Sequence, residues 1–366
     1  MVPVASEFSA FLAGRCADTV ALAPGIETPR CFSDAAGEHL ATRRAAGLFD
    51  FSFMYCVEIT GAGSGDFLAA LQTRAVDTLP SGRIAYTLLL RDDGSVLIDA
   101  TVWRLERDRY WLFTGRRGDA RYIADFARAY DVALSDRSTL QSVMAIQGPA
   151  SAAIIERTLR TANVAALPYF GFTQLAFAGA ECRVARIGYS GELGYEIVIA
   201  TAAAAALWSA LVDTGNDHGL REGGFAAIDS LRIEAGHLLF TRELAARAAP
   251  AELGLMRLID FYRQEFCGAA AVRAHRWSLP ARSLVGLLPL HGARFAPQAT
   301  TARTRGAGTL TSTAWSPIME CELGLGFVAA GDAYAGSTVK LDSGAAAKVA
   351  RLPFYDPARR LPRRAP

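Results

Sequence analysis

A glutamate and an arginine among apolar neighbours are the residues with the most chemical meaning in this chain. Glu196 ends Tyr189-Ser-Gly-Glu-Leu-Gly-Tyr-Glu196, a glycine-broken run with the alternation of a strand, and Arg232 lies in Asp229-Ser-Leu-Arg232-Ile-Glu-Ala-Gly, which has helical spacing. A charge that is partly removed from water needs a partner, and a planar ligand with donors and acceptors could supply it. Two alternatives stay open: Glu196 could face solvent, and Arg232 could pair with Asp229 three residues earlier.

Asp99 is a third acid in an unusual place. It lies in a predicted strand, Val-Leu-Ile-Asp-Ala-Thr-Val-Trp, where alternation puts it on the same face as Leu97, Thr101 and Trp103. Aspartate is a poor strand former, so Asp99 is either at an edge of the sheet or belongs to a functional site. Tyr86 and Tyr189 could line such a site, although each could equally be a core or rim aromatic.

Several other chemistries lack their motifs. The chain has no GxxxxGK[ST] phosphate loop and no GxSxG nucleophile elbow. Its cysteines and histidines are dispersed and form no CxxC pair, so neither a zinc site nor a disulfide framework is indicated and no metal is predicted. Only two lysines occur, Lys340 and Lys348, which leaves poor candidates for a Schiff base.

Composition narrows the class of protein. The chain has 366 residues, 51% of them hydrophobic and 20% charged, with a net charge of +2. This length predicts two or three domains, and the near-neutral charge gives no reason to expect a nucleic-acid partner. No stretch of about 18 uncharged apolar residues predicts a membrane span, and the N-terminus lacks the pattern of a signal peptide. We therefore expect a cytoplasmic protein without a membrane partner.

The predicted elements change character along the chain. The first fifty residues read as helix and loop, whereas residues 51–139 alternate between strands and helices, with Asp92-Asp93-Gly94 as a hairpin turn. This region reads as a compact α+β unit inserted into a larger domain. Residues 140–250 contain further strands and helices, residues 251–280 read as a helical connection, and residues 281–366 read as a small all-β domain.

Taken together, these segments resemble the folate-dependent aminomethyltransferase family, whose founder is the glycine-cleavage T-protein. The resemblance extends along nearly the whole chain, and its motifs follow one another in the family order. They are Arg44-Ala-Ala-Gly-Leu-Phe-Asp50, Ser81-Gly-Arg-Ile-Ala-Tyr86, Gly94-Ser-Val-Leu-Ile-Asp99, Ala145-Ile-Gln-Gly-Pro149, residues 187–197, residues 229–236 and Ser316-Pro317.

The resemblance implies a fold and a division into domains. The expected fold is α+β, a three-domain cloverleaf with a ferredoxin-like inserted domain and a C-terminal small β-barrel. Residues 1–50 and 140–250 would form a discontinuous folate-binding domain, residues 51–139 the inserted domain, residues 251–280 the helical connection and residues 281–366 the barrel.

The resemblance also implies a cofactor and roles for the five candidate residues. Tetrahydrofolate would occupy the centre of the cloverleaf. Asp99 would be the catalytic carboxylate beside the nitrogens that accept the one-carbon unit, and Glu196 would hold the amino and amide edge of the pteridine. Arg232, Tyr86 and Tyr189 would belong to the same pocket.

The departures from the founder concern other positions. Ser52-Phe53 stands where the founder has Ser-His, Ile228 replaces an arginine, and Phe240 replaces a tyrosine. The founder's strand-end asparagine is replaced near Thr114-Gly115. We interpret this as a preserved folate site with a diverged substrate side.

The sequence thus predicts a tetrahydrofolate-dependent one-carbon transferase acting on a small N-, O- or S-methylated or aminomethyl donor. The first alternative is the glycine-cleavage reaction proper, with a lipoyl carrier protein as partner. A folate-binding scaffold without catalysis is the second, although such a protein has little reason to keep Asp99. The iron-sulfur maintenance branch of the family is disfavoured, because its cysteine motif is absent from Ile187-Gly-Tyr-Ser-Gly-Glu192.

Overall fold

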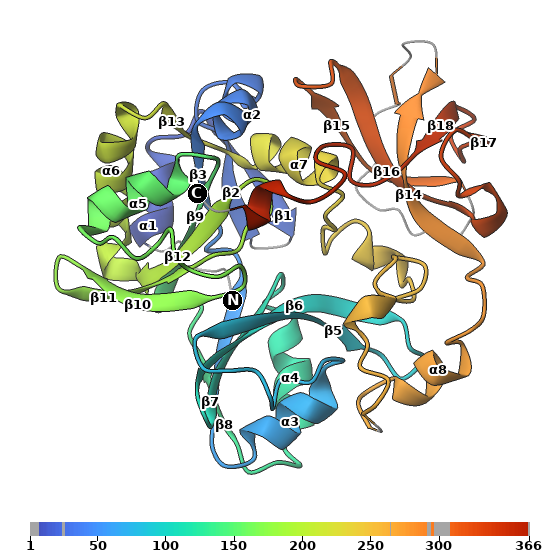
Figure 1. The fold of residues 1–366 in the computed structure, drawn as a ribbon, viewed down its shortest axis with the longest axis horizontal. Helices are drawn as coiled ribbons and strands as arrows, with labels where there is room; N and C mark the ends of the chain where they lie inside the picture. The colour runs from blue at the N-terminus through green and yellow to red at the C-terminus, as the bar shows by residue number, and fades with distance from the viewer. Residues whose placement is uncertain (1–6, 24–25, 264, 291–293, 296–307, 365–366) are drawn as a thin grey trace.

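A computed structural model describes residues 7–23, 26–263, 265–290, 294–295 and 308–364. Figure 1 shows three lobes set around a common centre: the first at upper left, the inserted lobe below, and the C-terminal lobe at upper right. This is the expected α+β cloverleaf. No helix in the part of the chain that is described is long and apolar enough to cross a membrane.

The first lobe is built on a six-stranded mixed sheet in the order β10-β11-β12-β9-β3-β13. One face is covered by helices, and its core is formed by side chains such as Tyr195, Ile197 and Trp208. The opposite face contributes Ala145, Val198 and their neighbours to a second core, shared with the inserted lobe. The strands are β3 (Ala46–Asp50), β9 (Gln141–Gln147), β10 (Phe172–Phe177), β11 (Ala180–Ala185), β12 (Gly194–Ala200) and β13 (Leu220–Glu222). The helices are α1 (Glu7–Ala13), α2 (Ala35–Arg44), α5 (Ser151–Leu159), α6 (Thr201–Asn216) and α7 (Phe225–Glu234).

The prediction that the first fifty residues contain only helix and loop is wrong. They include an antiparallel pair of strands, β1 (Asp18–Ala23) and β2 (Ile26–Cys31), as well as β3 in the central sheet. The Pro-Gly dipeptide between the first two strands in the sequence is a turn signal that could have revealed them. The strand β3 lacks alternation because it is buried along most of its length, which removes the signal.

The inserted lobe is a five-stranded antiparallel sheet in the order β5-β6-β7-β4-β8. Along the chain the lobe has one strand, a helix, three strands, a second helix and a last strand. This order is ferredoxin-like, with one additional strand at the edge of the sheet. The expected hairpin at Asp92-Asp93-Gly94 is confirmed, and Gly94 has φ of +76°, which favours glycine. The elements are β4 (Tyr55–Thr60), α3 (Ser64–Leu71), β5 (Arg83–Leu90), β6 (Val96–Glu106), β7 (Arg109–Thr114), α4 (Asp119–Ala127) and β8 (Ala133–Asp136).

The C-terminal lobe is a five-stranded antiparallel sheet in the order β15-β16-β14-β18-β17. Among the described residues the outer strands do not pair, so the sheet is barrel-like without closing. Its strands are β14 (Arg282–Pro289), β15 (Thr309–Ser316), β16 (Cys321–Ala329), β17 (Thr338–Lys340) and β18 (Ala346–Ala350), with η4 (Ala330–Asp332) between them. The segment that leads to it is helical only in part, with η1 (Leu244–Ala246), η2 (Met256–Leu258) and α8 (Ala269–Ala274).

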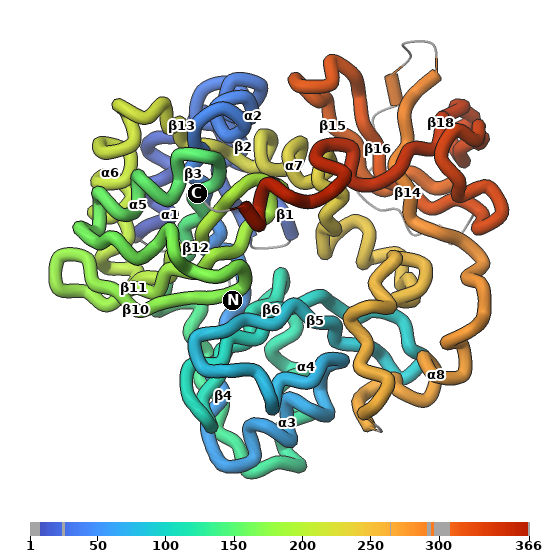
Figure 2. Tube along the Cα trace, viewed as in Figure 1, coloured from blue at the N-terminus to red at the C-terminus, as the bar shows by residue number. Residues whose placement is uncertain are grey.

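The last segment of the chain runs from the C-terminal lobe back to the first lobe. Figure 2 shows the final described residues, in dark red, crossing from the C-terminal sheet toward β12, and η5 (Leu361–Arg363) lies on this return path. Arg186 of the first lobe donates hydrogen bonds to the carbonyl oxygens of Pro362 and Arg364. The three lobes therefore enclose one central region.

Candidate functional site

Glu196 lies in β12 and its carboxylate is buried. The register pairs it with Ala145 of β9 and Ala185 of β11, so it shares the sheet face that packs toward the inserted lobe. Only 8% of the residue is exposed, which contradicts the solvent-facing alternative. None of the described residues forms a hydrogen bond or ion pair with its carboxylate, and burial alone raises the pKa of Glu196 to about 8. Burying such a carboxyl costs free energy unless hydrogen-bond donors satisfy it.

Asp99 lies in β6 and is held by a tyrosine from the neighbouring strand. The Tyr86 hydroxyl donates to Asp99 Oδ2 over 2.9 Å. The alternation expected from the sequence is confirmed, because Ile98 and Ala100 enter the core while Asp99 stays partly exposed on the other face. Burial raises the pKa of Asp99, and the hydrogen bond from Tyr86 opposes that rise. Asp99 is therefore a partly exposed carboxyl that Tyr86 orients.

Tyr189 joins this pair from the loop before β12. Its ring stacks on His237, with centroids 5.6 Å apart, and its hydroxyl donates to the carbonyl oxygen of Leu238. Burial raises the pKa values of Tyr86 and Tyr189, and the negative charge of Asp99 raises both further, which places the three side chains in one electrostatic cluster. Tyr86 and Tyr189 are both partly exposed.

Arg232 is completely buried at the end of α7, and its guanidinium is occupied by protein groups. Nε donates to Asp229 Oδ1 over 2.8 Å, so the salt bridge considered from the sequence is present. Nη1 contacts Glu243 Oε2 at 2.9 Å and Nη2 contacts Ser312 Oγ of β15 at 2.6 Å. Burial alone lowers the pKa of Arg232, but the two carboxylates outweigh it and raise the pKa. Arg232 thus fastens α7 to the connection and to the C-terminal sheet.

Several groups at this centre were missed by the sequence reasoning. His237 donates from Nδ1 to the carbonyl oxygen of Tyr189 over 3.0 Å, and burial lowers its pKa to about 4, so its ring is neutral and Nε2 is an acceptor. Arg359, on the returning C-terminal segment, has no ion-pair partner among the described residues. Burial lowers the pKa of Arg359, and the neighbouring Arg257 and Arg363 lower it further.

These three arginines form a cationic rim next to the cluster. The charge of Arg257 acts on Tyr86, and that of Arg359 acts on His237, as the shifts in their pKa values record. No local pattern marks them in the sequence, because arginines are scattered throughout the chain.

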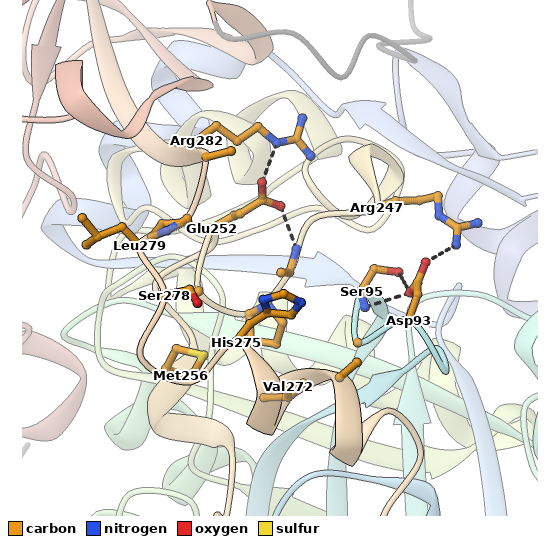
Figure 3. Close-up of a pocket in the computed structure, with 17 residues that line it drawn as sticks. Asp93, Ser95, Arg247, Glu252, Met256, Val272, His275, Ser278, Leu279 and Arg282 are labelled. Atoms are coloured by element: carbon orange, nitrogen blue, oxygen red, sulfur yellow. Dashed lines mark hydrogen bonds and ion pairs between the residues drawn. The ribbon is translucent and has the colours of Figure 1, made fainter.

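A separate cavity of about 470 Å³ lies between the β5-β6 hairpin, the connection and the start of β14 (Figure 3). Its labelled side chains include His275, Met256 and Leu279, and its charged groups are paired: Glu252 with Arg282 at 2.9 Å and Asp93 with Arg247 at 2.7 Å. None of the five candidate residues lines it. Within the described residues, no three His, Cys, Asp or Glu side chains are grouped so as to hold a metal ion.

Comparison with known proteins gives the family. The GCVT N-terminal domain matches residues 11–263, and the glycine cleavage T-protein C-terminal barrel domain matches residues 282–356. The chain belongs to this family, whose enzymes are transferases that use tetrahydrofolate. The resemblance, the enzyme class and the cofactor expected from the sequence are thereby confirmed.

Individual relatives are similar over most of their length. The chain is 32% identical to an aminomethyltransferase of Bacillus subtilis over 345 residues, covering 90% of this chain and 93% of the relative. It is 29% identical to an aminomethyltransferase of Halothermothrix orenii over 342 residues, which cover 90% of this chain and 94% of the relative. The crystal structure of glycine cleavage system aminomethyltransferase T from Bartonella henselae superposes with a TM-score of 0.82 at 25% identity, covering 95% of this chain and 97% of that one.

Proposed function

We propose that this chain transfers a one-carbon unit, methyl or aminomethyl, from a small donor to tetrahydrofolate held between the three lobes. The observation that carries the proposal is Glu196, a buried carboxylate that no described residue satisfies. The pteridine edge of tetrahydrofolate carries adjacent N–H donors, and two such donors suit the two oxygens of one carboxylate. Ionised Glu196 would hold this edge.

The rest of the site has the polarity that a folate requires. Tyr86 and Tyr189 present aromatic surface for a planar ring. Arg257, Arg359 and Arg363 supply positive charge and form no ion pair with a described residue, and the glutamate end of a folate carries two carboxylates. These features support a ligand with its pteridine toward Glu196 and its tail toward the arginines.

Asp99 is the proposed catalytic residue. Its carboxylate, oriented by Tyr86, would stabilise positive charge as the one-carbon unit passes between donor and acceptor nitrogen, which is electrostatic help without a covalent intermediate on the protein. We propose Arg232 as a positioning residue for the same site, since its donors already hold Asp229, Glu243 and the carbonyl oxygen of His237.

The donor that we favour is a small N-, O- or S-methylated compound. Phe53, Ile228 and Phe240 support this choice, because they place apolar groups where the founder type has polar ones. The alternative is the glycine-cleavage reaction proper with a lipoyl carrier protein, and it draws support from the relatives named aminomethyltransferase. Both proposals need the same folate site.

Calorimetric titration with tetrahydrofolate tests the shared site. Glu196→Ala should weaken binding strongly, while Glu181→Ala, which changes an exposed acid on β11, should not. Unchanged affinity in Glu196→Ala would refute the pteridine assignment. Incubation with tetrahydrofolate and a panel of methylated amines, ethers and sulfonium compounds, read by the mass of the folate, then distinguishes methyl from methylene transfer.

A further inference from the structure

His237 lies just beyond the end of α7, in a turn that fixes its backbone. Gly236 has φ of +66°, and its N–H donates to the carbonyl oxygen of Ile233 over 3.0 Å. The N–H of His237 donates to the carbonyl oxygen of Arg232 over 2.8 Å. These two bonds form a Schellman cap, which ends a helix and turns the chain in a defined direction. The backbone of His237 is therefore held by the helix end that carries Arg232.

The imidazole of His237 is held in one orientation and one tautomer. Nδ1 lies 3.0 Å from the carbonyl oxygen of Tyr189, which can only accept, so Nδ1 carries the proton. The ring stacks on that of Tyr189 with the two planes at 24°, and the Tyr189 hydroxyl donates to the carbonyl oxygen of Leu238. Burial lowers the pKa of His237 to about 4, and the charges of Arg359 and Arg232 act in the same direction. The ring is therefore neutral, and Nε2 carries a lone pair.

Nε2 of His237 is an acceptor that lacks a donor. No described residue donates a hydrogen bond to it, and the atom is not sealed from solvent. Tyr189, on which the imidazole stacks, belongs to the electrostatic cluster with Tyr86 and Asp99. The charge of Arg359, on the returning C-terminal segment, acts on the same imidazole. His237 therefore borders both the cluster and the cationic rim, and its lone pair is available to a ligand.

We infer that His237 is a specificity-determining residue, whose Nε2 accepts a hydrogen bond from a ring N–H of reduced folate and so selects tetrahydrofolate over folic acid. This inference rests on the proposed function and deepens it. The two ligands differ in one ring: N5 and N8 carry hydrogen in tetrahydrofolate, whereas both are bare acceptors in folic acid. A lone pair that faces a bare ring nitrogen stays unsatisfied, so a site that offers an acceptor to a ligand N–H rejects the analogue that lacks it.

A neutral imidazole suits this selection better than a charged group. An imidazolium would present a second N–H and would favour the oxidised ring, whose bare nitrogens accept. The positive charges of Arg359 and Arg232 act against that protonation. Glu196 does not make the same distinction, because the amino and amide edge that it is proposed to hold is identical in the two ligands. The two residues would therefore read different parts of one pteridine.

Calorimetric titration of the whole protein with tetrahydrofolate and with folic acid measures this preference without turnover. Wild-type protein should bind tetrahydrofolate more tightly. His237→Phe keeps a ring to stack on Tyr189 but lacks the acceptor, so the preference should fall about 5- to 150-fold, through weaker binding of tetrahydrofolate. His237→Gln offers an acceptor again and should keep most of the preference. His275→Phe, which changes an exposed histidine of the connection, is the matched control and should leave it unchanged.

A spectroscopic measurement on wild-type protein separates this contact from a structural role of the ring. In protein labelled with ¹⁵N-histidine, the Nε2 resonance of His237 is assigned by its loss in His237→Phe or His237→Gln. It should have the chemical shift of an unprotonated ring nitrogen in the free protein. Tetrahydrofolate should move it toward the protonated range, because a lone pair that accepts a hydrogen bond resembles a protonated nitrogen, whereas folic acid should not.

The outcomes separate this inference from the proposed function. If tetrahydrofolate binds but the preference is unchanged in His237→Phe, the role of His237 is refuted while the folate site stands. An Nε2 resonance that tetrahydrofolate leaves in place refutes it as well, and this result does not depend on the folding of any variant. If neither folate binds to the wild-type protein, the proposed function fails and this inference fails with it.

Discussion

Binding of tetrahydrofolate should release a proton from Glu196. Burial raises the pKa of this carboxyl to about 8, because no described residue donates a hydrogen bond to it. A carboxylate that accepts two N–H donors has a low pKa, so the bound form is ionised. At pH 7 about nine-tenths of the free protein carries the proton, and binding should therefore release about 0.9 proton.

The affinity should follow the same ionisation. The Kd for tetrahydrofolate should fall about tenfold per pH unit between about pH 5.5 and 7.5 and level off above about pH 8. Glu196→Gln should remove this dependence. A charge-assisted hydrogen bond contributes about 1.5–3 kcal/mol, so at pH 9 the variant should bind about 10- to 150-fold more weakly. At pH 7 the ionisation of Glu196 costs about 1.4 kcal/mol, which reduces that difference about tenfold.

Calorimetry in buffers with different heats of ionisation measures the released proton directly. Glu181→Gln, which alters an exposed acid on β11, is the control and should keep the wild-type pH dependence. Equal pH dependence in wild-type and Glu196→Gln protein, or binding without proton release at pH 7, would refute this reasoning.

The same carboxyl should make the free protein less stable as the pH rises. In the folded state Glu196 keeps its proton up to about pH 8, whereas its ordinary pKa is 4.5. Between these values the unfolded state binds fewer protons, so the free energy of unfolding falls as the pH increases, by about 1.4 kcal/mol per unit. Glu196→Gln should thus raise the Tm relative to wild type at pH 8 more than at pH 5. The same Tm difference at both pH values would contradict the raised pKa.

Four further substitutions test the rest of the site. Asp99→Asn should still bind tetrahydrofolate but lose about 10²–10³ in kcat; full activity would remove its proposed role. Tyr86→Phe removes the hydrogen bond that lowers the pKa of Asp99, so the acidic limb of the pH–rate profile should move to higher pH; an unmoved limb would contradict this. Arg359→Gln should weaken folate binding mainly at low salt, and unchanged affinity at low ionic strength would exclude it from the tail site. Arg232→Met should cost about 3–5 kcal/mol in unfolding free energy because it leaves Glu243 buried and unpaired; a smaller loss in urea titrations would argue against that buried pair.

Local patterns were enough to place two of the site's acids on the correct faces. Alternation in β6 and β12 put Asp99 and Glu196 opposite the core-facing neighbours that the structure confirms. The turn at Gly94 followed from glycine's tolerance of positive φ. Strand β3 was not predicted because it is buried on both faces, so its sequence does not alternate between apolar and polar residues.

The sequence by itself determined the family, the mixture of strands and helices in the inserted lobe, and the faces on which Asp99 and Glu196 lie. These follow from ordered motifs and from side-chain periods that neighbouring residues set. Only the tertiary structure decided that Glu196 is buried with no partner among the described residues, that Arg232 pairs with Glu243 and Ser312, and that Arg359 returns to the site. The physical reason is that burial and charge pairing depend on groups far apart in the chain, which come together only when the three lobes close around their centre.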